Sequence, residues 1–524
     1  MIAVTRIIAE GPLIFLAMLS LSSILLVSLR RWYEKRGKRS ILPPGPRGLP
    51  FIGNLLQLPR DNTLLARPFA DLSRQYGPIY YLRVINTHFV IVNDLNMART
   101  LFEKRSAIYS HRPRVPMVND VIKRDTMLFM NYGAAYRQSR RLVATFLNPR
   151  IASKYWPAQE AESIKFALGV RKAPQDVQKL TRWTATSLII RLVYGLEVTG
   201  KDDPLVSLAE DFSRLTADST TPGRWLVDSF PILRHIPTWF PGAGFKRWAM
   251  RAKARMDEFA YLPYQVAKDK ITQGDIAPSW TAEKLLESIE PPTGQEEKEI
   301  RHTATSLYSG GSDTTNAMVS SFVLLMLHYP EVQQKAQAEV DRVTGGAWVP
   351  RMHDREQFPY LDCVLKELFR FNPAVPLVPH SLHQDDFFEG YLIPKDAWVI
   401  ANLWGFMHDE TRYPDPDVFM PERFEANTAT GRVPQEDPLD IVFGFGRRSC
   451  PGYLLALASV YLNVVHLLFA FDIVPAKDEA GNDDIPPVAF IEGHVSHPKH
   501  FKCHVRERSA ERMTLLEHTL ASLQ

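Results

Sequence analysis

A single cysteine lies in a loop rich in glycine and arginine, directly before a long apolar run. Cys450 belongs to the stretch Phe-Gly-Phe-Gly-Arg-Arg-Ser-Cys-Pro-Gly, residues 443–452, and the run from Tyr453 to Phe471 follows it. Gly446 and Gly452 permit backbone angles closed to other residues, so the loop can fold tightly around the sulfur. The apolar run predicts a helix, and the positive end of a helix dipole favours thiolate over thiol. The stretch therefore predicts a metal ligand or a nucleophile, although a free cysteine is often only a small buried residue.

The fixed positions of this loop follow the spacing Phe-x-x-Gly-x-Arg-x-Cys-x-Gly, in which the first glycine is Gly446. This spacing resembles the haem-binding signature of the cytochrome P450 family. The resemblance implies that Cys450 is the proximal thiolate ligand of a haem iron, that Phe443 shields the sulfur and that Arg448 pairs with a haem propionate. A thiolate ligand pushes electron density onto the iron and favours cleavage of the O–O bond. Haem is therefore the expected cofactor.

A second stretch breaks a local rule inside an otherwise consistent helix. Residues 299–327 predict one long helix, yet residues 310–315 at its centre read Gly-Gly-Ser-Asp-Thr-Thr. The two glycines alone cost about 1 kcal/mol each relative to alanine. The string marks either a kink or a functional site where hydroxyls compete for backbone carbonyls. It resembles the oxygen-binding groove of the same family, which implies that Thr314 hydrogen-bonds the bound dioxygen and that Asp313 helps to bring protons from solvent.

Residues 133–141 are similar to the C helix of the family, in which a tryptophan and an arginine four residues later both reach haem propionates. Here Tyr136 replaces the tryptophan, and Arg140 is the expected propionate partner. Arg137 and Arg141 are either solvated helix charges or a basic face that docks an acidic electron donor.

Glu367 and Arg370 are three residues apart and share a helix face, and Arg423 follows in a Pro-Glu-Arg-Phe loop. Together they resemble the Glu-x-x-Arg helix of the family and its partner loop, which implies a buried charge network with a structural role. Between them, residues 376–380 look like the strand along the haem edge, with His380 as a propionate partner. A surface histidine is the alternative.

Composition limits the class of protein. The 524 residues carry a formal net charge of +4, and nothing in that balance predicts a nucleic-acid partner. Three cysteines argue against a disulfide framework and for a reducing compartment. The expected fold class is mainly α with small β-sheets (α+β), as in the cytochrome P450 fold. Two short strands are expected at Ile79–Ile85 and His88–Val92, separated by an Asn-Thr turn.

The N-terminus predicts a transmembrane anchor helix. Gly11 to Leu29 carries no charged residue and is close to the ~20 residues that a helix needs to cross a bilayer. Basic residues follow at once, where a cleaved signal peptide would show a small-residue cleavage site. The positive-inside rule places the following chain in the cytosol, so we expect a single-pass endoplasmic reticulum protein. The expected parts are a membrane anchor with its basic flank at 1–40, a proline-rich hinge at 41–50 and a haem-thiolate monooxygenase domain at 51–524.

The resemblance implies a monooxygenase that uses O₂ and electrons from NADPH, delivered by a separate NADPH–cytochrome P450 reductase. No Gly-x-Gly-x-x-Gly opens a helix after a strand, which agrees with an external electron donor. A haem-thiolate isomerase or dehydratase is one alternative, against which the Asp313–Thr314 pair argues. A haem sensor or carrier is another, and it need not keep such a pair.

The expected substrate is a lipophilic, largely uncharged, terpenoid-like molecule, oxidised in fungal secondary metabolism. Residues 225–244 alternate prolines with aromatics and correspond to the roof of the family's substrate pocket, which can dip into a membrane surface. The segments expected to line the pocket are mostly apolar. Lys123, Arg124 and Asp125 at its rim are interpreted as solvated loop charges.

Overall fold

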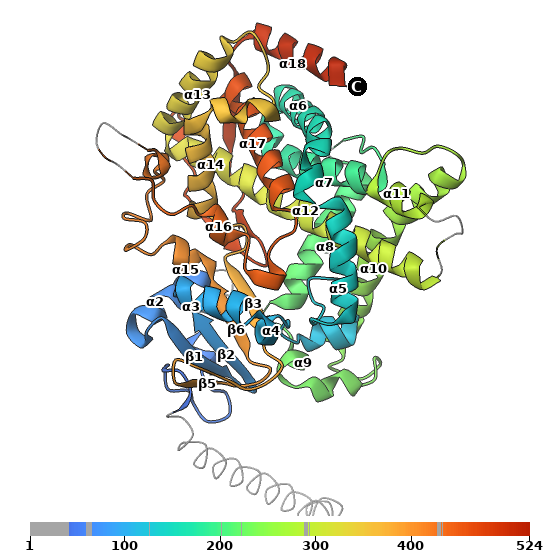
Figure 1. Cartoon of the computed structure of the whole chain (residues 1–524), viewed down its shortest axis with the longest axis vertical. Coiled ribbons are helices and arrows are strands. Elements are labelled where there is room, and N and C mark those ends of the chain that lie inside the picture. The colour runs from blue at the N-terminus through green and yellow to red at the C-terminus, as the bar shows by residue number, and fades with distance from the viewer. Residues whose placement is uncertain are drawn as a thin grey trace, which may run out of the picture.

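Helices dominate the computed structural model, and short strands form small sheets among them, as the sequence predicts (Figure 1). The structure describes residues 41–523 except 59–64, 125, 201, 222, 288–291, 293, 427–430 and 432. The predicted anchor at Gly11–Leu29 and its basic flank lie outside the described residues. In chain order the helices are α2 Ala66–Tyr76, α3 Leu95–Arg99, α4 Ser106–Tyr109, α5 Ala134–Phe146, α6 Trp156–Lys172, α7 Val177–Tyr194, α8 Pro204–Thr220, α9 Leu226–Ser229, α10 Gly244–Thr272, α11 Trp280–Leu286, α12 Gly294–His328, α13 Pro330–Thr344, α14 Pro359–Phe371, α15 Leu403–Met407, α16 Leu439–Val442, α17 Tyr453–Ala470 and α18 Ala510–Leu523.

The largest sheet has the strand order β1-β2-β6-β3. β1 Ile79–Val84 pairs antiparallel with β2 Thr87–Val92, which runs parallel to β6 Trp398–Asn402, and β6 pairs antiparallel with β3 Leu377–Ser381. The predicted hairpin is confirmed, but its turn begins one residue early, at Ile85, which has a φ of 53°. The remaining strands are β4 Asp386–Phe388, β5 Tyr391–Ile393, β7 Phe471–Lys477, β8 Asp483–Asp484, β9 Phe490–Glu492, β10 Ser496–Pro498 and β11 Cys503–Glu507.

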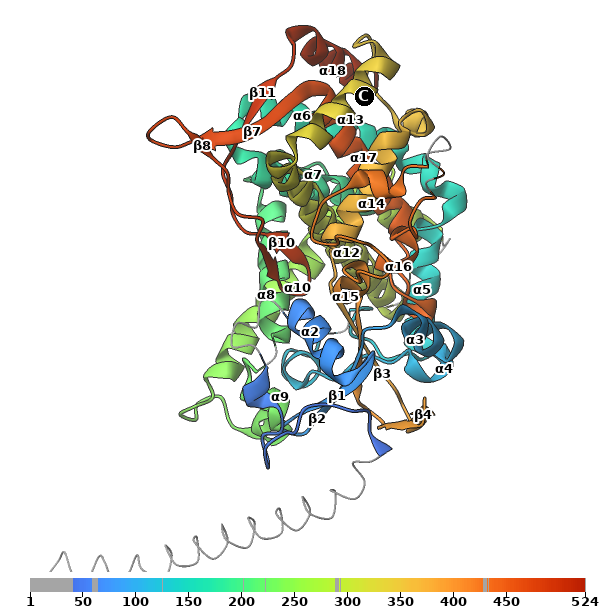
Figure 2. The same ribbon diagram turned by 90° about the vertical axis from the view of Figure 1, so that its left-hand side faces the viewer.

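α12 passes through the middle of the molecule in both views (Figures 1 and 2). Its C-terminal half shares one apolar core with α6, α13, α14 and α17. Its N-terminal half belongs to a second core with α7, α8 and α10. Because the 310–315 segment lies where these two cores meet, any site built on it sits at the centre of the protein.

α17 confirms the helix that the apolar run after the cysteine predicts. By length and mean hydropathy, 1.9, it is the one described helix that could cross a membrane, but 78% of it is buried inside the protein. Its side chains are apolar on every face because α6, α12, α13 and α14 surround it. α17 is therefore a core helix that fixes the position of the loop before it.

The proline-rich segment packs along β1. The carbonyl of Pro44 accepts a hydrogen bond from Tyr81 N at 2.7 Å, and Asn54 Nδ2 donates to the carbonyl of Pro46 at 3.0 Å. A Cβ at Gly45 would lie 2.0 Å from Tyr81 O, so only glycine fits there. The chain thus enters the domain along the edge of the main sheet.

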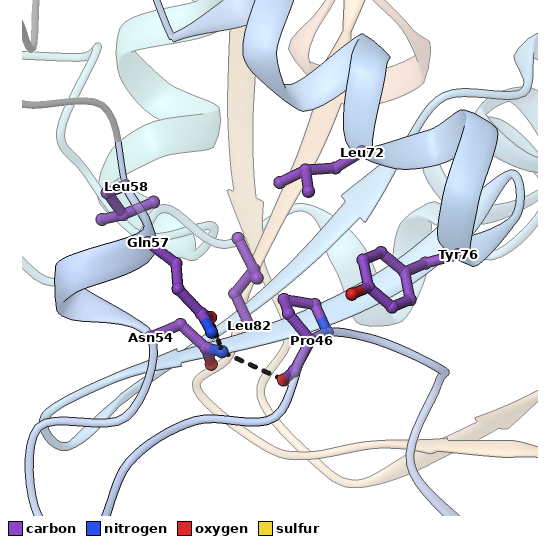
Figure 3. Close-up of a pocket in the computed structure, with 7 residues that line it drawn as sticks. All are labelled: Pro46, Asn54, Gln57, Leu58, Leu72, Tyr76 and Leu82. Atoms are coloured by element: carbon purple, nitrogen blue, oxygen red, sulfur yellow. Dashed lines mark hydrogen bonds between the residues drawn. The ribbon is translucent and has the colours of Figure 1, made fainter.

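A surface cavity of about 210 Å³ lies beside this segment (Figure 3). Its walls come from the proline-rich segment, α2, β1 and the short turn before the first gap in the described chain. The lining residues are Pro46, Asn54, Gln57, Leu58, Leu72, Tyr76 and Leu82. The cavity contains none of the site residues that the sequence predicts.

The buried charge network is confirmed. Glu367 and Arg370 have no exposed surface, and Arg423 is 2% exposed. Arg370 donates to both carboxylate oxygens of Glu367, at 2.7 and 2.8 Å, and Arg423 Nε donates to the same carboxylate at 3.1 Å. Both arginines also donate to backbone carbonyls, Arg370 to those of residues 407 and 416 and Arg423 to that of residue 414. The network ties α14 to the Pro-Glu-Arg-Phe loop.

Candidate functional site

The cysteine loop is held in shape by left-handed glycines and backbone hydrogen bonds. Cys450 N donates to Phe443 O at 2.8 Å, while Gly444 and Gly446 have φ values of 76° and 52°. A Cβ at Gly446 would lie 2.2 Å from the carbonyl oxygen of Phe102. Gly446 is therefore required twice, by its φ angle and by this close approach. The same expectation for Gly452 is wrong, because its φ is −92°.

Cys450 has accessible surface and also lies close to other parts of the protein. Burial raises the pKa of its thiol, and the Gly452 N–H and the Arg140 charge offset this only in part. The expectation that the helix N-terminus makes this thiol a thiolate is therefore not met by the protein surroundings, since burial is the largest influence on its pKa. A coordinated metal ion deprotonates a thiol outright.

α5 holds the backbone of the loop. Tyr136 and Arg140 are four residues apart on one face of this helix. The Tyr136 hydroxyl donates to Arg447 O at 3.0 Å, and an Arg140 nitrogen donates to Ser449 O at 2.9 Å. The Arg448 guanidinium stacks on the Tyr136 ring, 3.8 Å from its centroid. Tyr136 thus supplies both a hydrogen bond and a ring face where the family has a tryptophan.

Two partly buried arginines, Arg112 and Arg448, have no carboxylate partner among the described residues. Arg448 donates to the carbonyls of residues 110, 127 and 130. Arg112 donates to Pro379 O at 2.5 Å, its Nε has no partner, and burial together with the Arg448 charge lowers its pKa to about 9. No carboxylate of the described residues forms an ion pair with either arginine. Because a buried unpaired charge is costly, these residues fit a cofactor that brings its own carboxylates, as the propionates of haem do.

His380 is 1% exposed, so the alternative of a surface histidine is wrong. Its Nδ1 lies 2.8 Å from Tyr109 O, which can only accept, and therefore Nδ1 carries the hydrogen. Burial lowers the pKa of His380 well below its ordinary value, and the ring is neutral with an unpartnered Nε2. In this state Nε2 is an acceptor. The predicted bond to a propionate therefore requires protonation of the ring.

Phe443 packs against α14, its ring 5.6 Å from that of Phe369.

α12 continues without a break through residues 310–315, and the Thr314 hydroxyl donates to Gly310 O at 3.0 Å, as the competing hydroxyl predicts. Gly310 is exposed, and a Cβ there would meet nothing within 4 Å. α12 therefore keeps accessible surface at this point, although it lies in the middle of the protein (Figures 1 and 2).

Asp313 contacts a histidine and an arginine from two other elements. Its Oδ1 lies 3.1 Å from His497 Nε2, in β10, and 3.9 Å from a nitrogen of Arg182, in α7. Burial alone would raise the pKa of Asp313, but the His497 hydrogen bond and the charges of His497, Arg182 and His494 lower it below its ordinary value. Asp313 is therefore a carboxylate at neutral pH.

The interpretation of Arg124 as a solvated loop charge is wrong. Burial lowers its pKa to about 9, and its guanidinium lies over two aromatic rings, those of Phe129 and Phe212. Lys123 is exposed, as expected, and Asp125 lies outside the described residues. In this segment, which the sequence predicts to be a polar rim, the Arg124 side chain packs against aromatic rings of the protein.

Sequence reasoning did not find Arg112, His494 or His497. Arg112 stands in Ser-His-Arg-Pro-Arg, a loop with no periodic signal, and both histidines lie in the Gly-His-Val-Ser-His turn near the C-terminus. Their roles come from tertiary contacts with distant segments. The only available signal was the density of polar residues in otherwise apolar surroundings.

The predicted docking and roof residues are exposed. Arg137 and Arg141 both face solvent on α5. In the roof, Trp239 is 79% exposed, Phe230 45% and Phe240 46%. Trp225 differs, because its ring packs 4.4 Å from that of Trp248 and its indole donates to Asp218 O.

Comparison with known proteins gives consistent matches. The family model described as Cytochrome P450 matches residues 43–504. Cytochrome P450 monooxygenase claR of Ampulloclitocybe clavipes is 39% identical over 515 residues, which cover 98% of this chain and 94% of that protein. Cytochrome P450 monooxygenase 208 of Postia placenta is 37% identical over 509 residues, covering 96% and 98%. Cytochrome P450 monooxygenase claT of Ampulloclitocybe clavipes is 36% identical over 496 residues, covering 94% and 97%.

Proposed function

Since the chain belongs to the cytochrome P450 family and is a haem-thiolate monooxygenase, we propose that Cys450 is the axial ligand of its haem iron. The observation that carries this is the accessible thiol in a loop whose Arg448, like Arg112, is partly buried and lacks a carboxylate partner. Arg112 and Arg448 bind the haem propionates, and Tyr136 and Arg140 hold the cysteine loop in place. When bound, the haem supplies the chemistry that inserts one atom of O₂ into an organic substrate.

Thr314 and Asp313 manage protons on the opposite side of the site. The Thr314 hydroxyl donates to Gly310 O within its own helix. Because this bond is weak and replaceable, the hydroxyl can rotate and donate to a group bound in the site instead. Asp313 is ionised and reaches solvent through partly exposed partners, His497 and Arg182. The pair therefore passes protons from outside to the reacting atoms.

The substrate is a lipophilic, terpenoid-like molecule, and electrons come from NADPH through a cytochrome P450 reductase that docks on exposed Arg137 and Arg141. A place in fungal secondary metabolism is supported by the relatives claR and claT of Ampulloclitocybe clavipes. The apolar run at Gly11–Leu29 anchors the protein in the endoplasmic reticulum membrane.

A second apolar surface supports the membrane assignment. The exposed side chains of Leu226, Ile232 and Trp239 belong to α9 and the loops beside it. α9 lies at the same end of the molecule as β1 and β2 in both views (Figures 1 and 2). Leu49 and Leu56, 48% and 73% exposed, flank Gly53, which forms a bridge with Val84 of β1. These side chains rest on the bilayer, where lipophilic substrates concentrate.

The carbon monoxide spectrum of the ferrous protein tests the ligand. We expect the long-wavelength Soret band of thiolate ligation in the wild type and in Cys363→Ser, because Cys363 is buried in another core. Cys450→Ser should lose the band. A Cys450→Ser protein that keeps it would overturn the assignment. NADPH-dependent oxygenation of a lipophilic compound with reductase present tests the reaction.

A further inference from the structure

Arg124 occupies an unusual environment for a loop arginine. One of its terminal nitrogens donates to the Thr216 hydroxyl in α8 at 2.8 Å. Its guanidinium carbon lies 4.3 Å from the centroid of the Phe212 ring and 4.9 Å from that of Phe129. Its Nε is buried and has no hydrogen-bond partner. A guanidinium has five N–H donors, so this one keeps unused donors between two aromatic faces.

The surroundings place Arg124 on the α12 side of the site. Three residues after it, Met127 N donates to the Ser306 hydroxyl of α12 at 3.4 Å, about one turn before Gly310. Burial, together with the nearby charges of Arg112 and Arg124, lowers the pKa of His494 to about 4. A Cβ at Gly493, next to His494, would lie 3.7 Å from Cβ of Ala217 in α8. Arg124, α8, α12 and the turn at residues 493–495 therefore surround one region.

No described carboxylate neutralises Arg124. Asp313, the acidic side chain of the site, is already paired with His497 and Arg182. Arg124 is partly buried with a fully buried Nε, and burial lowers its pKa, so an unpaired charge there is unfavourable. Arg114, ten residues earlier, shows the ordinary arrangement, with a 62% exposed side chain paired to Asp120. The Arg124 position is thus arranged to receive an anion.

We propose that Arg124 binds the carboxylate of an otherwise apolar substrate. A carboxylate accepts two parallel N–H bonds from a guanidinium, which matches the unused donors. The Phe129 and Phe212 rings supply apolar contact for the carbon atoms next to that group. The inference rests on the proposed function and refines its substrate class from uncharged lipophilic molecules to lipophilic carboxylic acids. Arg124 would fix one end of the substrate and so determine which carbon lies near Thr314.

Calorimetric titration of the haem-loaded full-length protein tests the proposal. The probes are lauric, palmitic and abietic acid, each compared with its own methyl ester. We expect at least one acid to bind about tenfold more tightly than its ester or better, as the loss of a buried charge partner predicts. Arg124→Gln should abolish that preference, whereas Arg124→Lys should keep part of it because the charge remains.

Arg114→Gln is the matched control and should leave the preference unchanged, since its charge is exposed. Thr216→Val removes the hydroxyl that positions the guanidinium and should weaken the preference even if Arg124→Gln does not fold. The proposal is overturned if no acid binds more tightly than its ester, or if an Arg124→Gln protein with a normal carbon monoxide spectrum keeps the preference. Loss of that spectrum in the wild type would instead contradict the proposed function.

Discussion

His497 Nε2 lies 3.1 Å from Oδ1 of Asp313, and this contact joins the strand β10 to the centre of α12. Burial would otherwise keep the Asp313 carboxyl protonated to a higher pH, whereas His497, with the charges of Arg182 and His494, lowers its pKa. The ionisation of a residue in the proposed proton path therefore depends on a side chain from the C-terminal part of the chain.

His497→Ala should change the pH dependence of stability. In the wild type the folded-state pKa of Asp313 is below the ordinary 3.8, so its stabilising contribution is full above that value and is lost as pH falls through the lowered pKa. Without His497, burial should dominate and weaken or reverse this contribution at neutral pH. Melting temperature measured against pH checks this. His500→Ala, at an exposed position bonded to Gln178, is the control. Identical profiles for His497→Ala and wild type would refute the coupling.

Thr314→Ala should separate NADPH consumption from product formation. The hydroxyl bonds only the Gly310 carbonyl within its own helix, so its removal should leave folding and haem content intact. Product formed per NADPH should fall by roughly tenfold or more, with peroxide or water formed instead, because a positioned proton donor is lost. Thr315→Ser, one residue later in a buried position, is the control. Unchanged coupling in Thr314→Ala would count against the proton role.

Glu367→Gln should destabilise the domain severely. The change leaves Arg370 and Arg423 buried without their shared carboxylate, at a cost of about 3–5 kcal/mol. Asp257→Asn breaks an exposed pair with Lys253 on α10 and should cost about 0.5 kcal/mol or less. Denaturant unfolding, followed by circular dichroism, compares the two variants. Equal losses of unfolding free energy would mean that the buried network stabilises the domain no more than an exposed ion pair does.

Gly446→Ala and Gly444→Ala test the two requirements of the cysteine loop separately. Both residues have a positive φ, which costs a non-glycine residue about 1–2 kcal/mol. Only Gly446 also contacts the Phe102 carbonyl, while a Cβ at Gly444 meets open space. Haem bound per protein should therefore fall much further in Gly446→Ala than in Gly444→Ala. Similar haem content in both variants would show that the close approach is unimportant.

Local patterns predicted the elements whose signal is contained in a short stretch. α12 and α17 follow from hydropathy, and the Glu367 network follows from the resemblance to the cytochrome P450 family; the structure contains all three. The identity of the second left-handed glycine could not be predicted, because Gly444, Gly446 and Gly452 all suit a tight loop in sequence. Only the packed loop decides which φ angles are needed.

The prediction that Arg124 is solvated fails for a physical reason. Lys123 and Arg124 are adjacent and look equivalent in sequence, yet one is exposed and the other lies between two aromatic rings. The backbone of Lys123 is left-handed, with a φ of 60°, so the chain turns at this residue. Burial of a charge depends on which distant helix covers it, here α8, and no window of neighbouring residues contains that information.

The contacts of the cysteine loop also determine when, during protein synthesis, the proposed haem site can assemble. The residues that contact the loop are translated long before Cys450; they are Phe102, Tyr136 and Arg140. Domains generally fold as units while the chain emerges, but here the last third of the chain completes contacts begun by the first. Arg112, a proposed propionate partner, is likewise translated long before Arg448. A chain whose synthesis stops before residue 450 therefore lacks the proposed haem ligand.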